Sequence, residues 1–229
     1  MHYLALASDY DGTLARDGHV DATTVAALER LRASGRRLIL VTGRMLDDLQ
    51  RVFPHLHLCD RVVAENGALL YNPASRTEQL LGERPHDSFI QALRSRHVTP
   101  LAIGQVILAT WAPNLTAVKE TIQQQSLDLQ VIFNKDALMI LPSGINKASG
   151  LQAALYDLQL SPRNVVAVGD AENDHALLSQ CACAVAVANA LPMLKECADW
   201  VTPGSDGAGV RELIDRLIAS DLQDLNTCP

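Results

Sequence analysis

Three segments of the chain share one pattern, an apolar run that stops abruptly at polar residues. The runs lie at Tyr3–Ser8, Leu38–Val41 and Val165–Gly169. Near-continuous apolar runs of this length, without alternation, are typical of strands buried on both faces of a parallel sheet. The sequence therefore predicts three parallel strands, each followed by a cluster of hydroxyl, carboxylate or guanidinium groups.

A helix is predicted between the first two strands. Val25, Leu28 and Leu31 recur at helical spacing within residues 23–34, Asp21 is placed to cap the start, and Gly35 follows the end. Strand, helix and strand form a βαβ unit, and open parallel sheets bind ligands beyond the carboxyl ends of their strands. We therefore expect the three polar clusters to converge, although more than a hundred residues separate them.

The pattern changes in the middle of the chain. A further strand at 61–64 leads to Asn66-Gly67, a hairpin turn signal before Leu69–Tyr71. Hairpin-linked strands mixed with helices then predict a small antiparallel α+β layer inserted into the parallel fold. The expected elements are a strand near 79, a helix at 86–96, a strand at 105–109, a helix at 114–125, and strands at 130–133 and 137–141.

The parallel pattern resumes after the insert. Helices are predicted at 147–158, 174–180, around 191–197 and at 209–219, with strands starting at Val165 and at 184–187. The predicted fold class is α/β, a Rossmann-like doubly wound parallel sheet with a small inserted α+β domain. The expected division is a core formed by residues 1–78 and 143–229, with the insert at 79–142.

Composition narrows the class of protein. Of 229 residues, 48% are hydrophobic and 20% charged, which supports a packed core and excludes disordered and collagen-like classes. With 19 Lys and Arg against 26 Asp and Glu, the net charge is −7, which argues against nucleic acid or anionic lipid as a partner. We expect a small-molecule partner, and the composition leaves the oligomeric state open.

The sequence shows no signal for export or membrane insertion, which favours the cytoplasm. The start lacks a basic region before its short apolar run, and no stretch reaches the ~18 apolar residues of a membrane helix. The five cysteines are odd in number and lack C-x-x-C spacing, which favours a reduced compartment. The expected protein is cytoplasmic, with no contact to a membrane.

Acidic residues carry the sharpest chemical signal. Asp9 and Asp11 lie two apart after a predicted strand, so their side chains point the same way. Two close carboxylates repel each other unless a cation compensates, and nothing basic follows until Arg16. Asp170 and Asp174 follow another strand, again without a local basic partner. A bound divalent metal is the economical explanation, and oxygen ligands favour Mg²⁺.

Four motifs follow one another along the chain: Asp9-Tyr-Asp11-Gly-Thr13, Thr42-Gly-Arg44, Lys147 and Gly169-Asp170-Ala-Glu-Asn173-Asp174. In this order they resemble the motifs of the haloacid dehalogenase-like superfamily. The resemblance covers about Tyr3 to Leu217, and the placement of the insert resembles the C2-type cap of the Cof-type (IIB) subfamily. An insert of about 60 to 65 residues is similar to those of compact phosphoglycolate and sugar-phosphate phosphatases.

The resemblance implies catalytic roles for four residues. Asp9 corresponds to the nucleophile that forms an aspartyl-phosphate, and Asp11 to the general acid and base. Thr42 corresponds to a hydrogen-bond donor to a phosphoryl oxygen. Lys147 corresponds to the cation that neutralises the phosphoryl group and holds Asp9. A cation at a helix start is electrostatically disfavoured, so the position of Lys147 independently requires an anionic partner.

The resemblance also implies ligand sets. Mg²⁺ is expected on Asp9, the main-chain carbonyl of Asp11, and Asp170, with Asp174 as a further ligand or just behind it. The expected substrate-binding residues are Thr42, Gly43, Arg44, Asn66, Lys147 and Asn173.

Several of these residues also have purely structural interpretations. Thr42 could cap the next helix, and Arg44 could pair with Asp47 or Asp48 instead of substrate. Asn66 could serve only the turn, and Asn173 could orient Asp170 or cap a helix.

The predicted function is a Mg²⁺-dependent phosphatase acting on a small phosphorylated metabolite, a sugar phosphate or phosphoglycolate. A phosphotransferase of the phosphomannomutase type is the enzymatic alternative, and a non-catalytic phospho-acceptor or binding domain is the other. A dehalogenase fits less well, because halide departure does not need the proton that Asp11 would supply. The insert counts against a simple phospho-acceptor domain, which needs no lid.

Overall fold

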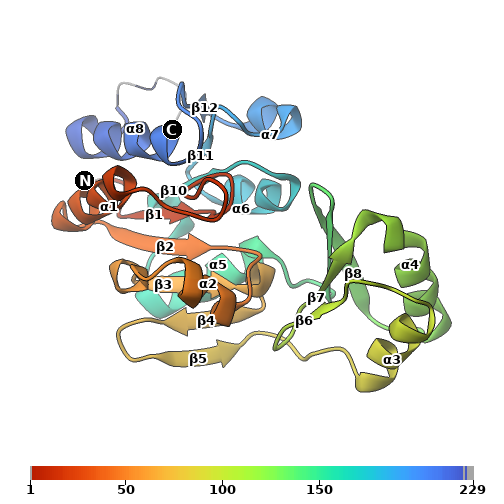
Figure 1. Ribbon diagram of the computed structural model, residues 1–229. Coiled ribbons are helices and arrows are strands. Elements are labelled where there is room, and N and C mark those ends of the chain that lie inside the picture. Colours follow the sequence, from red (N-terminus) through yellow and green to blue (C-terminus); the bar gives the residue numbers. More distant parts are fainter. Residues whose placement is uncertain (1, 224, 226–229) are drawn as a thin grey trace.

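An eight-stranded sheet forms the centre of the molecule (Figure 1). The computed structural model describes residues 2–223 and 225. In spatial order the strands are β12 (Trp200–Val201), β11 (Cys183–Ala186), β10 (Val165–Gly169), β1 (Ala5–Ser8), β2 (Arg37–Val41), β3 (Arg61–Ala64), β4 (Leu69–Asn72) and β5 (Thr77–Leu80).

The three apolar runs are neighbours in this sheet. Strand β1 pairs in parallel with β10 on one side and with β2 on the other, with Ala5 opposite both Val165 and Arg37. All residues of β1 and β10 are buried, as expected for strands covered on both faces. The sheet is parallel from β12 to β3, and β4 and β5 extend it in antiparallel fashion.

Helices cover both faces of the sheet. Helix α1 (Ala22–Ala33) packs on α8 (Asp206–Ser220), and α5 (Lys147–Leu158) packs on α6 (His175–Gln180). The chain moves in opposite directions along the sheet from β1 to β2 and from β10 to β11. Right-handed crossovers therefore place α1 and α6 on opposite faces, which confirms the doubly wound core. Two short helices, α2 (Leu46–Val52) and α7 (Pro192–Cys197), complete the core.

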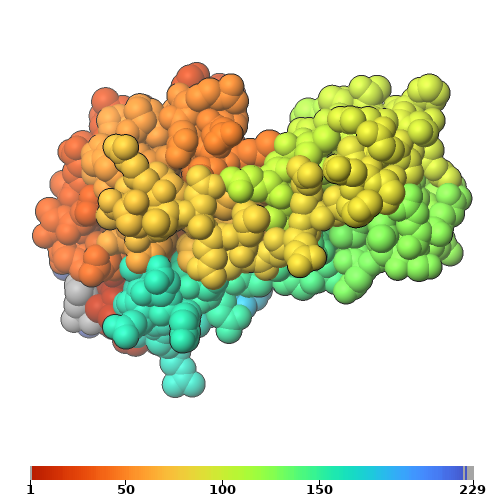
Figure 2. Space-filling model, turned by 90° about the horizontal axis from the view of Figure 1, so that it is seen from below, coloured from red at the N-terminus to blue at the C-terminus, as the bar shows by residue number. Residues whose placement is uncertain are grey.

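The insert folds as a separate antiparallel layer, here called the cap. Its sheet has the order β6 (Ala102–Ile103), β7 (Leu108–Trp111), β9 (Ala137–Pro142) and β8 (Leu129–Asn134). Helices α3 (Asp87–Ser95) and α4 (Leu115–Gln124) pack on it through a small apolar cluster of their own. Figure 2 shows the cap as a lobe beside the core. The expected α+β insert is therefore confirmed.

Two strands differ from expectation. The strand near residue 79 is β5, which pairs with β4 and so belongs to the core sheet rather than to the insert. The strand expected at 105–109 starts only at Leu108, because the N–H groups of residues 105–107 bind the Glu65 carboxylate instead of a neighbouring strand. Helix α2 and the short strands β6 and β12 were not predicted.

Two further findings bear on the surroundings of the chain. Among the described residues, no helix combines the length and apolar character needed to cross a membrane. Cys59, Cys181 and Cys197 are free, but Cys183 is disulfide-bonded, which runs against the expectation of fully reduced thiols. Cys228 lies outside the described residues.

The cap of α1 gives a stability prediction. Asp21 accepts the Thr24 N–H at 2.8 Å, as predicted for an N-cap. We expect Asp21→Ala to lower the free energy of unfolding by about 1 kcal/mol, measured by urea denaturation at neutral pH. The variant Asp128→Asn, at an exposed residue of the cap, should leave it unchanged.

The same residue predicts a pH dependence. Hydrogen bonds from Thr23 and Thr24, with Arg211 nearby, lower the pKa of Asp21 from 3.8 to about 2. A carboxylate with a depressed pKa in the folded state stabilises the fold above its unfolded pKa and loses that effect as pH falls. The difference between wild type and Asp21→Ala should therefore shrink as pH falls from 3.8 towards about 2. A difference that stays constant over this range would contradict the assignment.

Candidate active site

The loops after β10, β1 and β2 meet at the carboxyl edge of the sheet, as the sequence predicts. Asp9 directly follows β1, and its N–H donates to the Val168 carbonyl at 3.0 Å. Thr42 follows β2 and Asp170 follows β10. Because β10, β1 and β2 are adjacent, residues from three distant segments share one site.

A buried lysine joins two of the acids. The Lys147 side chain is 1% exposed, and its Nζ donates to Asp9 Oδ1 at 2.5 Å and to Asp174 Oδ1 at 2.6 Å. Lys147 is the first residue of α5, which Asn146 and Ser149 start with a reciprocal capping box. The lysine therefore has the anionic partners that its place at a helix start requires.

The Asp170 loop is held by its own side chains. Asp174 Oδ2 accepts the N–H groups of Asp170 and Ala171 at 3.0 and 3.1 Å. Asp170 Oδ1 accepts from the Thr13 hydroxyl at 3.1 Å, and Oδ2 from Lys135 Nζ at 2.8 Å. Asp174 thus orients both the Asp170 loop and Lys147.

Burial and the close charges shift the pKa values of the residues in this cluster. Loss of hydration and the neighbouring Asp174 raise the pKa of Asp9 well above its usual range, against the effect of Lys147. Burial alone would lower the pKa of Lys147, but Asp174 and Asp9 outweigh it and raise that pKa. The cluster holds three carboxyl groups and only two ammonium groups, those of Lys147 and Lys135, so acidic groups are in excess.

The donor set suits a metal ion. Asp9, Asp170 and Asp174 are buried, and one carboxylate oxygen from each lies within 4.8 Å of the others. Carboxylate oxygens are the ligands that hard divalent cations prefer, and the excess of acidic groups favours a cation. Asp174 is the least available of the three, because its Oδ2 accepts two backbone N–H groups and its Oδ1 accepts Lys147. Asp9 accepts on Oδ1 from Lys147, and Asp170 accepts from side chains only.

Asp11 lies outside this cluster. Arg44 grips its carboxylate with two hydrogen bonds, both 2.7 Å, from Nε and Nη2. Arg44 also pairs with Asp48, one of the two partners considered for it. The Asp11 side chain is 40% exposed, so it faces the solvent side of the site. Any contact of Asp11 with a metal would use its main-chain carbonyl.

The loop after β2 contributes backbone to the same site. Thr42 is buried, and its hydroxyl accepts the Arg44 N–H at 3.1 Å. A Cβ on Gly43 would lie 2.4 Å from Cε of Met139, a residue of the cap strand β9. Glycine at 43 therefore lets the cap approach this loop closely.

Asn66 and Asn173 form a buried pair. Asn173 Nδ2 donates to Asn66 Oδ1 at 3.0 Å. The remaining amide atoms, Asn66 Nδ2 and Asn173 Oδ1, are buried without a hydrogen-bond partner in the described part of the chain. Buried polar atoms without partners are costly, so these two are free to bind a water molecule or a ligand. Asn173 neither orients Asp170 nor caps a helix.

Comparison with known proteins identifies the family. The model of the haloacid dehalogenase-like hydrolases matches residues 6–105 and 96–214. The chain belongs to this family. A phosphoglycolate phosphatase of Methanothermobacter thermautotrophicus is 30% identical over 93% of this chain and 98% of its own length. Phosphoglycolate phosphatase 2 of Saccharolobus solfataricus is 28% identical over 95% and 94%.

Solved structures agree on the fold. A haloacid dehalogenase-like hydrolase from Bacteroides thetaiotaomicron superimposes with a TM-score of 0.80 at 21% identity, over 94% of this chain and 99% of its own. A HAD/COF-like hydrolase from Plasmodium vivax gives 0.81 at 22% identity, over 97% of both chains. The core and cap of this hydrolase are therefore those of the family.

Three residues of the site were not found from the sequence. Lys135 lies between the strands predicted at 130–133 and 137–141, and a lysine where a turn favours glycine was a usable signal. Glu65 and Met139 gave none, because their contacts join segments distant in sequence. Glu65 is buried and accepts three N–H groups, from residues 105, 106 and 107, at 2.8–2.9 Å.

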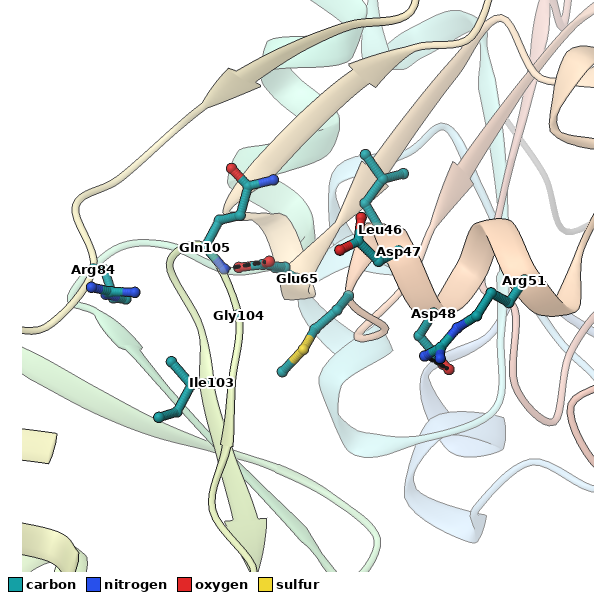
Figure 3. A pocket seen from close by; sticks show the side chains of 10 residues that line it. Leu46, Asp47, Asp48, Arg51, Glu65, Arg84, Ile103, Gly104 and Gln105 are labelled. Carbon is teal, nitrogen blue, oxygen red and sulfur yellow. Dashed lines mark hydrogen bonds and ion pairs between the residues drawn. The ribbon is translucent and has the colours of Figure 1, made fainter.

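A cavity of about 420 Å³ lies at this junction between core and cap (Figure 3). Its walls come from α2, from Glu65 and from the start of the cap, including Arg84 and residues 103–105. It borders Asp48, the partner of Arg44, but not Asp9. The cavity therefore does not include the cluster of Asp9, Asp170 and Asp174.

Gly67 gives a prediction about how this hydrolase positions Lys147. Its φ is +108°, and a Cβ there would lie 1.9 Å from the Asn146 carbonyl, next to Lys147. We expect Gly67→Ala to lower the free energy of unfolding by on the order of 2–4 kcal/mol, measured by urea denaturation. Gly35→Ala is the matched control, because Gly35 has a φ of +87° but open space around it. If both variants lose the same free energy of unfolding, the loss comes from the left-handed backbone conformation and not from the contact between residue 67 and the Asn146 carbonyl.

Proposed function

We propose that the protein is a Mg²⁺-dependent phosphatase that hydrolyses a small phosphorylated metabolite through an aspartyl-phosphate on Asp9. The observation that carries the proposal is the buried Asp9 carboxylate, held by Lys147 beside Asp170 at the carboxyl edge of the sheet. A solvated turn would not bury three acids around one ammonium group. Membership of a hydrolase family supports the same chemistry.

The first half-reaction uses Asp9 and Asp11. A carboxylate oxygen of Asp9 attacks phosphorus, the bond from phosphorus to the ester oxygen breaks, and Asp11 supplies the proton that the leaving oxygen takes. In the second half, Asp11 accepts a proton from water, whose oxygen attacks phosphorus and frees Asp9 and inorganic phosphate. Arg44 fixes the orientation of Asp11 through its two hydrogen bonds, so its effect on substrate runs through that carboxylate.

The charge of the phosphoryl group is met by the residues around Asp9. Mg²⁺, when bound by Asp9, Asp170 and the main-chain carbonyl of Asp11, would neutralise phosphoryl charge as a Lewis acid. Lys147 holds Asp9 in place and presents its own charge to the same oxygens. Asp174 keeps both Lys147 and the Asp170 loop in position.

Polar groups around the cluster would bind the phosphoryl oxygens. Thr42 and the N–H of Gly43 lie on the loop after β2, and Asn66 lies next to it, since its N–H donates to the Thr42 carbonyl at 2.9 Å. Of the two unpartnered amide atoms, Nδ2 of Asn66 can donate to a phosphoryl oxygen, and Oδ1 of Asn173 can accept from a donor of the substrate. These groups donate or accept from fixed positions, which suits a reaction catalysed mainly by positioning. The substrate-binding set is thus Thr42, Gly43, Asn66, Asn173 and Lys147, with Arg44 behind Asp11.

The relatives favour phosphoglycolate among the candidate substrates. Two proteins named phosphoglycolate phosphatase align over nearly their full length, including the cap region, at 30% and 28% identity. Because the cap supplies most contacts to a leaving group, alignment through the cap bears on the substrate as well as the chemistry. Sugar phosphates are the second class to test.

The test is phosphate release from phosphoglycolate, a panel of sugar phosphates and an aryl phosphate, each with Mg²⁺ and with EDTA. We expect release that needs Mg²⁺ and is fastest with phosphoglycolate. Transfer of the phosphoryl group to a second hydroxyl of a sugar, without release, would identify a phosphotransferase instead. A folded enzyme that turns over none of these compounds would overturn the proposal.

A further inference from the structure

The tip of the cap hairpin reaches the acid cluster. Lys135, in the turn between β8 and β9, donates from Nζ to Asp170 Oδ2 at 2.8 Å and from its backbone N–H to Glu172 Oε2 at 2.9 Å. Figure 1 shows this hairpin extending from the cap towards the core. Among the residues that the structure describes, no other cap side chain hydrogen-bonds to the cluster.

The backbone at Lys135 does not favour a lysine. Asn134 and Ala137 pair across the hairpin, so Lys135 is the first residue of a two-residue turn, and its φ is +53°. Glycine adopts this left-handed conformation without cost, whereas a side chain is disfavoured there. Local structure therefore gives no reason for a lysine at 135, and the contact with Asp170 does.

The contact between Lys135 and Asp170 involves a residue that we propose as a metal ligand. Asp170 is fully buried, and its two oxygens are engaged by Thr13 and Lys135. Lys135 meets Asp170 as an ammonium, the ordinary state of a lysine at neutral pH. A divalent cation on Asp170 would be a second positive charge on the same carboxylate. The metal ion and the Lys135 ammonium would then repel each other.

We propose that Lys135 is an active-site residue supplied by the cap, and that its ammonium competes with Mg²⁺ for Asp170. The inference rests on the proposed metal site. Metal binding weakens the hold of the hairpin tip on the core, and removal of the ammonium strengthens metal binding. The released ammonium then lies beside the site, where an anionic substrate can take it as a partner.

Calorimetric titration of EDTA-treated enzyme with Mg²⁺, without substrate, tests the competition. Lys135→Gly removes the ammonium and suits the backbone, so the hairpin should stay folded, and Lys135→Gln keeps the length of the side chain. Both variants should bind Mg²⁺ about fivefold more tightly than wild type, with a smaller gain at high salt. Lys119→Gln, an exposed lysine of the cap helix α4, should bind like wild type.

Hydrogen exchange gives a second readout. Amides of residues 129–142 should exchange faster in wild type when Mg²⁺ is added without substrate, and should not respond in Lys135→Gly. A purely structural clamp would leave both the Mg²⁺ affinity and the response of these amides unchanged. That result overturns the inference.

The design separates the two proposals. Asp170→Asn should abolish Mg²⁺ binding if the metal site is where we place it. Wild type that binds Mg²⁺ no better than Asp170→Asn would contradict the proposed metal site itself. Wild type that binds, with both Lys135 variants unchanged, contradicts only the role of Lys135.

Discussion

Asp9→Asn is expected to reduce phosphate release by a factor on the order of a thousand or more, with substrate and Mg²⁺ saturating. The amide has nearly the same shape as the carboxylate but no nucleophilic oxygen, so no aspartyl-phosphate can form. Lys147 keeps Asp174 as a partner in the variant. The measurement is the initial rate of phosphate release under identical conditions for both proteins.

The loss should not arise from unfolding. Burial raises the pKa of Asp9, which means that the fold disfavours its charge, and a neutral amide removes that charge. Urea denaturation should therefore find Asp9→Asn at least as stable as wild type in the absence of Mg²⁺. Asp128→Asn, at an exposed aspartate of the cap, controls for the substitution itself and should keep full activity. Retention of activity in Asp9→Asn would show that Asp9 is not the nucleophile.

Lys147→Met is expected to abolish turnover and to lower the free energy of unfolding by about 3 kcal/mol. The buried ammonium compensates Asp9 and Asp174 at 2.5 and 2.6 Å, and the variant leaves both carboxylates buried without it. Methionine fills a similar volume, so a packing defect contributes little. Urea denaturation at neutral pH measures the loss, and Lys119→Met, at an exposed lysine, is the control.

The origin of this loss can be tested by pH and by a second substitution. Without Lys147 the folded-state pKa of the buried carboxylates is raised, so their destabilising effect is present at high pH and fades as they take up protons. The gap to wild type should therefore be smaller at about pH 5 than at about pH 8. Adding Asp9→Asn to Lys147→Met should recover part of the stability. A gap that neither acid nor the second substitution reduces would point to packing instead of charge.

The core site was predictable because it depends on a regular feature of the fold. Asp9, Thr42 and Asp170 each follow an apolar strand, and the ends of neighbouring parallel strands meet at one edge. The helix at Lys147–Leu158 was predicted with its observed bounds, and Asn146 caps its start in the structure. The position of Lys147 at a helix start correctly indicated an anionic partner.

What the sequence did not reveal depends on contacts between core and cap. Lys135 reaches Asp170, and Glu65 binds the backbone of residues 105–107, across separations that leave no local pattern. The contact between Glu65 and the backbone of residues 105–107 also explains why the cap strand β7 begins at Leu108. Strand β5 was assigned to the insert because nothing in its four exposed residues marks the sheet to which it belongs.

The central claim is that Asp9 carries the phosphoryl group, and acid quench of the enzyme during turnover of an aryl phosphate with Mg²⁺ tests it most directly. Peptide mass spectrometry would then locate any phosphoryl group. The account predicts one phosphoryl group on Asp9, and a larger trapped fraction in Asp11→Asn, which keeps the nucleophile but loses the base for hydrolysis. Phosphate release at the full rate with no phosphoryl group on Asp9 in either protein would contradict the account.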